Sequence, residues 1–90
     1  MVNYLRDKAS DLLRRISFQK RLNFRVETNV DPYLIDETDR NFRDRLRVAL
    51  TQQEIAQIEG EILKWAKDDE PCIPQWFIDR LIYKVNLKHI

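Results

Sequence analysis

Residues 51–67, TQQEIAQIEGEILKWAK, carry the clearest signal of secondary structure in the chain. Thr51 followed by Glu54 forms a capping box, in which the threonine hydroxyl accepts a hydrogen bond from a free amide at the helix start and the glutamate reaches back to the amide of the cap. At about 100° per residue, the apolar side chains of this stretch gather on one face. They are Ile55, Ile58, Ile62, Leu63, Trp65 and Ala66. We predict a helix from Thr51 to Lys67 with one buried face, and expect it to be the central element of the fold.

The composition of the chain favours a small helical domain. Its 90 residues are 43% hydrophobic, which suits one core. Glycine occurs once and proline three times, so the residues that tight turns between strands require are nearly absent. We predict a single, mostly α domain over residues 1–90, built as a compact bundle of about four helices.

Three further helices are predicted from apolar residues that recur at three- and four-residue spacing. The first spans residues 4–20 and the last spans residues 74–86. Between them, Asp31 can cap a helix and Pro32 can occupy its first position, where a missing amide costs nothing. A helical run is expected to follow over residues 39–50.

Residues 22–27, LNFRVE, break the helical period. Leu22, Phe24 and Val26 alternate with polar residues, and a period of two is typical of a strand. A strand needs a partner, and no second alternating segment exists in the chain. Two hypotheses follow: the segment is extended and packs its apolar side chains on the helices, or it pairs as a strand with the same segment of a second copy.

The last predicted helix is apolar on two sides. The first stripe is expected to face the core and consists of Phe77, Ile78, Leu81, Ile82 and Val85. The second stripe lies roughly opposite and consists of Trp76, Arg80, Tyr83 and Leu87. A chain of this size can hardly surround such a helix, and Trp, Tyr and Arg are the residue types in which binding energy concentrates at interfaces. We predict that the second stripe binds a protein partner, or a second copy of the chain.

Basic residues are concentrated in the N-terminal third. Residues 1–26 carry seven Lys and Arg against two Asp, whereas residues 27–71 carry twelve acidic and six basic side chains. Either these parts attract one another within the fold, or the basic residues bind a polyanion. The candidate anion or nucleic-acid contacts are Arg14, Arg15, Lys20, Arg21, Arg25, Arg40, Arg43 and Arg47.

The last three of these arginines share one face of the second predicted helix, where guanidinium groups suit phosphate. Asp36 and Asp44, however, lie four residues on either side of Arg40, which is the spacing of ion pairs within a helix. The alternative hypothesis is therefore a surface that neutralises its own charge.

Nucleic acid is the alternative partner. If residues 22–27 pair between two copies, the order of elements from Leu22 to about Lys67 resembles that of ribbon-helix-helix DNA-binding proteins. The resemblance implies a dimeric nucleic-acid-binding module. The chain departs from that pattern because no glycine-containing turn separates the two helices and a further helix precedes the strand.

Residues for catalysis and metal binding are scarce. The single His89 and the single Cys72 do not supply a nucleophile, a base and an orienting group together. They also do not supply the ligand sets of common metal sites. Glu59 projects toward the apolar face of residues 51–67, either as a functional carboxylate or as an ion-paired side chain at the edge of the core.

These observations favour a small non-enzymatic regulatory or adaptor protein without a cofactor. No stretch predicts a signal peptide or a membrane span. A lone cysteine cannot form an intramolecular disulfide, which favours a reducing compartment. We therefore expect a cytoplasmic protein that binds another protein, or a second copy of itself, with nucleic acid as the alternative partner.

Overall fold

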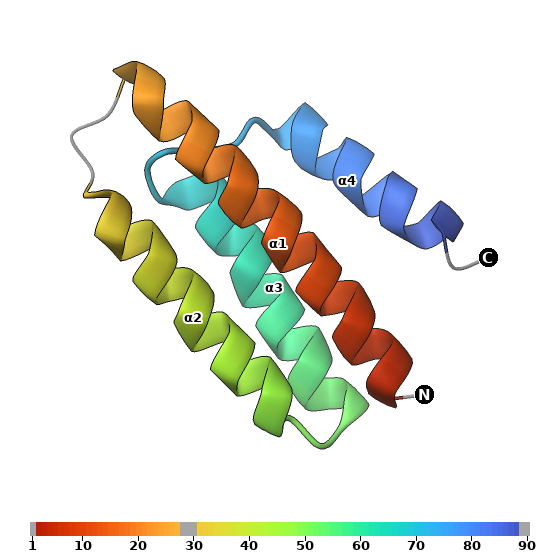
Figure 1. Ribbon diagram of the computed structural model, residues 1–90. Coiled ribbons are helices and arrows are strands. Elements are labelled where there is room, and N and C mark those ends of the chain that lie inside the picture. Colours follow the sequence, from red (N-terminus) through yellow and green to blue (C-terminus); the bar gives the residue numbers. More distant parts are fainter. Residues whose placement is uncertain (1, 28–30, 89–90) are drawn as a thin grey trace.

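Four α-helices follow one another along the described part of the chain. The computed structural model describes residues 2–27 and 31–88, with the side chains of residues 2–23 and 31–83. The helices are α1 (Val2–Glu27), α2 (Pro32–Val48), α3 (Gln52–Asp68) and α4 (Gln75–Lys88). α1 packs against α2 and α3, and α4 lies along the other side of α1 (Figure 1). The prediction of a mostly α, compact bundle of about four helices is confirmed.

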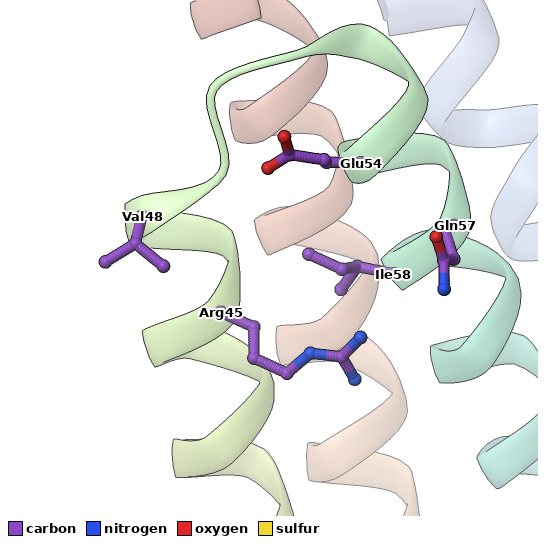
Figure 2. A pocket seen from close by; sticks show the side chains of 5 residues that line it. All are labelled: Arg45, Val48, Glu54, Gln57 and Ile58. Carbon is purple, nitrogen blue, oxygen red and sulfur yellow. The ribbon is translucent and has the colours of Figure 1, made fainter.

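The two internal helices begin at the residues that the sequence marks as caps. The side chain of Asp31 accepts a hydrogen bond from a first-turn amide at 2.9 Å, and Pro32 is the first helical residue. At α3, the Thr51 hydroxyl accepts from the Glu54 amide at 3.1 Å. The Glu54 carboxylate reaches toward the turn (Figure 2) and accepts from the Leu50 amide at 3.2 Å, one residue before the cap. The capping box is therefore right for the threonine and displaced by one residue for the glutamate.

Replacing Thr51 with alanine should lower the free energy of unfolding by about 1 kcal/mol, because the Glu54 amide loses its acceptor. Thr51→Ser keeps the hydroxyl and should stay within about 0.5 kcal/mol of the parent. Urea unfolding followed by circular dichroism measures both variants. An equal loss in the two would show that the hydroxyl does not cap α3.

Residues 22–27 are helical, so the prediction of an extended or strand-like segment there is wrong. α1 continues to Glu27, beyond its predicted end at residue 20. Once a helix has formed, each further residue adds a hydrogen bond at small cost, and no glycine or proline interrupts the chain before Pro32. Three alternating apolar residues are too few to separate a strand from a helix surface. Without that strand, the resemblance to ribbon-helix-helix proteins loses the element on which it depends.

The core lies where α1, α2 and α3 meet and extends to α4. Of the apolar face predicted for α3, Leu63 is partly buried at the edge of the core and all the other members are buried. The ring of Trp65 lies 5.8 Å from that of Phe42 in α2. The buried apolar residues are Ala9, Leu12, Leu13, Ile16, Ile35, Phe42, Leu46, Ala49, Ile55, Ile58, Ile62, Trp65, Ala66, Ile73, Ile78 and Leu81.

α1, rather than α3, is the central helix, which corrects the expectation from the sequence. α1 contacts each of the other three helices and takes part in most of the packing between helices, whereas α2 and α4 share no contact in the described part of the chain. Its 26 residues, against 17 in α3, let it pack against α2 and α3 on one side and α4 on the other. Among the described helices, none combines the length and the apolar character needed to cross a lipid bilayer.

Candidate protein-binding surface

Three of the four residues predicted to bind a partner lie together on the outer face of α4. Trp76, Arg80 and Tyr83 are all exposed and occur at positions i, i+4 and i+7, which lie on one side of a helix. Trp76 and Tyr83 are each 64% exposed. The side chain of Leu87 lies outside the described residues. We refer to Trp76, Arg80 and Tyr83 as the α4 face.

The α4 face points outward because the opposite side of the helix is anchored in the core. The carbonyl of Pro74 accepts hydrogen bonds from the amides of Phe77 and Ile78 at 3.1 and 3.2 Å, which begins the helix. Ile78 and Leu81 are then buried. The Trp76 ring stands edge-on to Phe77, with centroids 5.8 Å apart and planes at 74°. The predicted division of α4 into a core side and an outer side is confirmed for its described side chains.

A groove of about 420 Å³ lies between α1 and α4, beside the α4 face. It is lined by Arg14, Arg15, Phe18, Gln19, Arg21, Phe77 and Leu81. Phe18 is 59% exposed and was not among the residues predicted to form a binding surface. A signal was present, since Phe18 falls outside the buried stripe of its helix and therefore has no place in the core.

Two of the candidate anion-binding arginines share one carboxylate. Arg14 donates to Asp11 at 2.7 Å and Arg15 donates to the other oxygen of Asp11 at 3.0 Å. Burial acts to raise the pKa of Asp11, but the hydrogen bonds and charges of the two guanidinium groups hold that pKa below its ordinary value. The cluster therefore keeps one net positive charge.

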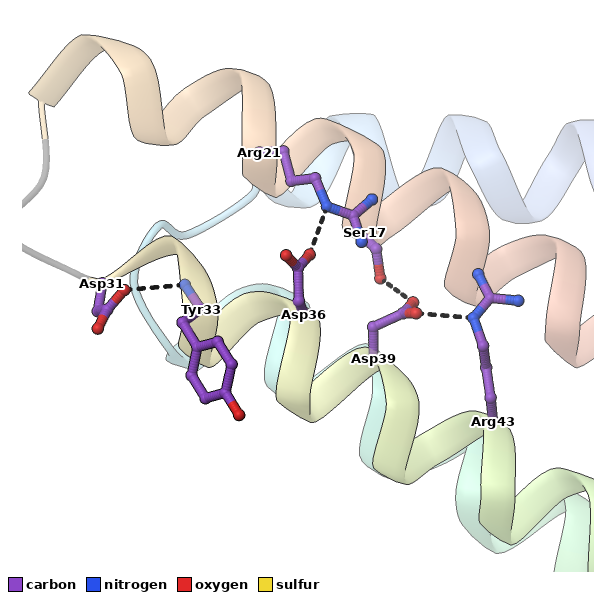
Figure 3. Close-up of polar contacts among 7 residues, drawn as sticks. All are labelled: Ser17, Arg21, Asp31, Tyr33, Asp36, Asp39 and Arg43. Carbon is purple, nitrogen blue, oxygen red and sulfur yellow. Dashed lines mark hydrogen bonds and ion pairs between the residues drawn. The ribbon is translucent and has the colours of Figure 1, made fainter.

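Two further candidates bind carboxylates of α2 (Figure 3). Arg21 of α1 donates to Asp36 at 2.8 Å, which links the two helices. Arg43 donates to one oxygen of Asp39 at 2.7 Å, while the buried hydroxyl of Ser17 donates to the other at 2.6 Å. These contacts join the basic N-terminal third to the acidic part of the chain.

The other two candidate arginines of α2 do not form the ion pairs predicted around Arg40. Arg47 pairs with Asp44 at 3.1 Å, three residues away. Arg40 is exposed, and its two expected partners are used elsewhere, Asp36 by Arg21 and Asp44 by Arg47. Spacing along one helix does not show which carboxylates a neighbouring helix will engage. The side chain of Arg25 lies outside the described residues.

The pair of Arg45 and Glu61, which joins α2 to α3, was not predicted from the sequence. Both Nη atoms of Arg45 donate to the Glu61 carboxylate at 2.8 Å. These hydrogen bonds lower the pKa of Glu61 and raise that of Arg45. The pair is exposed and lies 16 residues apart in sequence, so helical spacing gave no signal for it.

Lys20 is buried, so its prediction as an anion or nucleic-acid contact is wrong. Its side chain is 0% exposed, and its ammonium donates to the carbonyls of Asp69 and Pro71 at 2.6 and 2.9 Å. The ammonium also lies 4.7 Å from the centre of the Trp65 ring, which is a cation–π contact. Lys20 thus caps the C-terminal end of α3, where cations are favoured.

Arg6 performs the same task for α2. Its guanidinium donates to the carbonyl of Leu46 at 2.9 Å and also to that of Ala49. Two basic residues of α1 therefore satisfy carbonyls at the ends of two neighbouring helices. The acceptors are backbone carbonyls rather than carboxylates, so these two basic residues are used inside the fold to hold helix ends and not to bind acidic side chains.

Stability should depend on pH through Lys20. Burial lowers the pKa of its ammonium to about 8 from an ordinary value of 10.5, while Cys72 and Asp69 act in the opposite direction. The folded state therefore releases this proton at lower pH than the unfolded state. The part of the stability that depends on this proton is therefore greatest above pH 10.5, decreases as the pH falls towards about 8, and stays at its lower value below that.

The measurement compares the parent with Lys20→Met by urea unfolding at several pH values. The difference in unfolding free energy, parent minus variant, should increase between pH 8 and 10.5 and be flat below pH 8. Groups that titrate in both proteins cancel in this difference. A difference that is constant or falls over that range would contradict a lowered pKa.

Other candidates from the sequence do not assemble a site in the described part of the chain. Glu59 is half-buried, and Cys72 is exposed. His89 lies outside the described residues. Two smaller hollows, of about 220 and 270 Å³, each include a carboxylate in their lining: Glu54 in the first, near Arg45 (Figure 2), and Asp69 and Glu70 in the second.

Comparison with known proteins adds no further assignment. No protein-family model, curated protein sequence or solved structure matches this chain.

Proposed function

We propose that this chain is a small non-enzymatic adaptor or regulatory protein that binds a partner protein through the α4 face. The observation that carries the proposal is the exposure of Trp76 and Tyr83, 64% each, on the same side of a helix whose opposite side is buried. Large aromatic side chains held outward by a fixed helix are typical of the residues that dominate binding energy at interfaces.

The two aromatic rings supply the attraction and Arg80 supplies orientation. Removal of apolar surface from water favours the complex, and a guanidinium between two aromatic residues can pair with a carboxylate at the edge of the contact. Since the α4 helix is already anchored by Ile78 and Leu81, little order has to be gained on binding.

The test is affinity capture of the intact protein from cells that express it, comparing three forms. Trp76→Ala/Tyr83→Ala removes the aromatic side chains of the α4 face. Tyr33→Ala/Val48→Ala is the matched control, since these α2 residues are 61% and 66% exposed. Circular dichroism should show equal helicity in all three forms. A partner retained by the control but lost by the α4 variant is expected; a partner retained equally by all forms would overturn the proposal.

The proposal also predicts weak binding to nucleic acid. Lys20 is buried, and five of the other seven candidate contacts are paired with four carboxylates that neutralise most of their positive charge. The parent protein should therefore not retard a short DNA duplex or a single-stranded RNA in a gel shift at low salt. Retardation that weakens steeply as salt increases would instead favour the nucleic-acid alternative.

A further inference from the structure

The groove between α1 and α4 combines positive charge with apolar surface. Arg14, Arg15 and Arg21 lie on its α1 side, and Phe18 lies among them. Phe77 and Leu81 form the α4 side. None of these lining residues carries a carboxylate, whereas the two smaller hollows near Glu54 and near Asp69 each include at least one.

Within the described part of the chain, the three guanidinium groups keep most of their donors. Each has five N–H groups, one of which donates to a carboxylate of a described residue. Their side chains are 62%, 34% and 46% exposed for Arg14, Arg15 and Arg21. Because Arg14 and Arg15 share the single charge of Asp11, a second carboxylate is favoured beside them.

The apolar part of the groove would bind apolar side chains of an occupant. Phe18 is 59% exposed, and Phe77 is half-buried beside the ring of Trp76. An occupant that covers these rings needs apolar side chains at its centre. An inorganic anion or a uniformly acidic chain would satisfy the arginines but leave the rings in water.

The spacing of the groove residues on α1 suits a second helix lying along the groove. Arg14, Phe18 and Arg21 occupy positions i, i+4 and i+7, so the two arginines lie about 10.5 Å apart along the helix axis, with the aromatic ring between them. A second helix with carboxylates seven residues apart and apolar residues between them has the same spacing. We propose that the groove is the docking site for an acidic amphipathic helix of the partner protein. This inference rests on the proposed function and names the chemistry of the partner segment.

The test uses a displayed library of random helical peptides of about five turns, roughly 18 residues, selected for binding to the intact protein. We expect the enriched peptides to carry Asp or Glu on both sides of an apolar stripe. Arg14→Glu/Arg21→Glu should weaken their binding at least about tenfold. A second selection on this variant should enrich Lys or Arg at the positions where the first enriched acids.

The matched control is Arg45→Glu/Arg47→Glu. This variant makes the same change in charge as Arg14→Glu/Arg21→Glu. It also removes two ion-paired arginines, Arg45 paired with Glu61 and Arg47 paired with Asp44, but both residues lie on α2 and outside the groove lining. Binding by the control should stay within about twofold of the parent. Thermal unfolding of both variants checks that the helices remain folded.

Several results would overturn the inference. These are failure to enrich any peptide, enrichment of neutral or basic peptides, and equal weakening by both charge variants. Size-exclusion chromatography with light scattering tests whether a second copy of the chain occupies the groove. If the parent is a dimer and Arg14→Glu/Arg21→Glu is a monomer, the occupant is a second copy and not a helix of another protein. Binding of the parent, lost in the same variant, to vesicles of equal parts phosphatidylcholine and phosphatidylserine would assign the groove to a membrane surface instead.

The proposal about the groove and the proposal about the α4 face can be contradicted independently of each other. If Trp76→Ala/Tyr83→Ala abolishes capture of the cellular partner and Arg14→Glu/Arg21→Glu does not, the proposed function stands and the inference about the groove falls. If only the arginine variant abolishes capture, the groove is supported and the α4 face is not the contact.

Discussion

Lys20→Ala should lower the free energy of unfolding by about 3–5 kcal/mol, a large part of the stability of a domain of this size. The substitution removes a side chain that is 0% exposed, and it leaves the carbonyls of Asp69 and Pro71 without their donor. The contact with the Trp65 ring is lost as well. Since these contacts hold the segment between α3 and α4 against α1, the loss should be measured as a decrease in the midpoint of urea unfolding.

Two variants show which part of the Lys20 contact matters. Lys20→Met keeps most of the buried volume and avoids the cost of burying a charge. Its decrease in the free energy of unfolding should therefore be less than half the decrease caused by Lys20→Ala. Lys8→Ala removes a lysine of the same helix that is only half-buried and should change stability by less than about 0.5 kcal/mol. Equal effects of Lys20→Ala and Lys8→Ala would contradict the buried cap.

Ile62→Ala should lower the free energy of unfolding by about 2–5 kcal/mol, because Ile62 is 0% exposed at the centre of the buried face of α3. The truncation removes apolar contacts and leaves a cavity that the surrounding helices fill only in part. Leu50→Ala removes a similar side chain that is 78% exposed and should change stability by less than about 0.5 kcal/mol. Similar losses in the two variants would contradict the placement of α3 in the core.

The parts of the fold that were predicted correctly rest on contacts between near neighbours in the sequence. Thr51 and Asp31 cap helices through amides two or three residues away, so their side chains are sufficient to mark the start. The apolar period of residues 51–67 likewise predicted which face is buried. The error at residues 22–27 came from a pattern too short to outweigh continuation of a helix that had already formed.

The polar contacts between helices were the hardest to predict. Asp36 and Asp44 were expected beside Arg40, but Asp36 lies next to α1 in the fold and binds Arg21. Lys20 gave a usable signal, since it continues the stripe of Ala9, Leu13 and Ile16 at helical spacing, and a lysine in that stripe must find carbonyls or carboxylates inside the fold. Which carbonyls it meets depends on the segment after α3 and could not be predicted from α1 alone.

The candidate surface was predicted in part. Two stripes on α4 were enough to place Trp76, Arg80 and Tyr83 outside the core. The groove beside them was not predicted, because it depends on α4 packing along α1 and bringing Phe77 near Phe18. An exposed aromatic residue on one helix becomes informative only when the fold shows what lies next to it.

The role of the α4 face is tested most directly by site-specific photocrosslinking in cells. A photoreactive phenylalanine analogue is placed at position 76 or 83, and in separate proteins at the control positions 33 and 48, which are equally exposed. We predict a crosslinked product of one shared mass from positions 76 and 83 and none from positions 33 and 48. No product from the α4 positions, or the same product in equal yield from the α2 positions, would contradict binding through the α4 face.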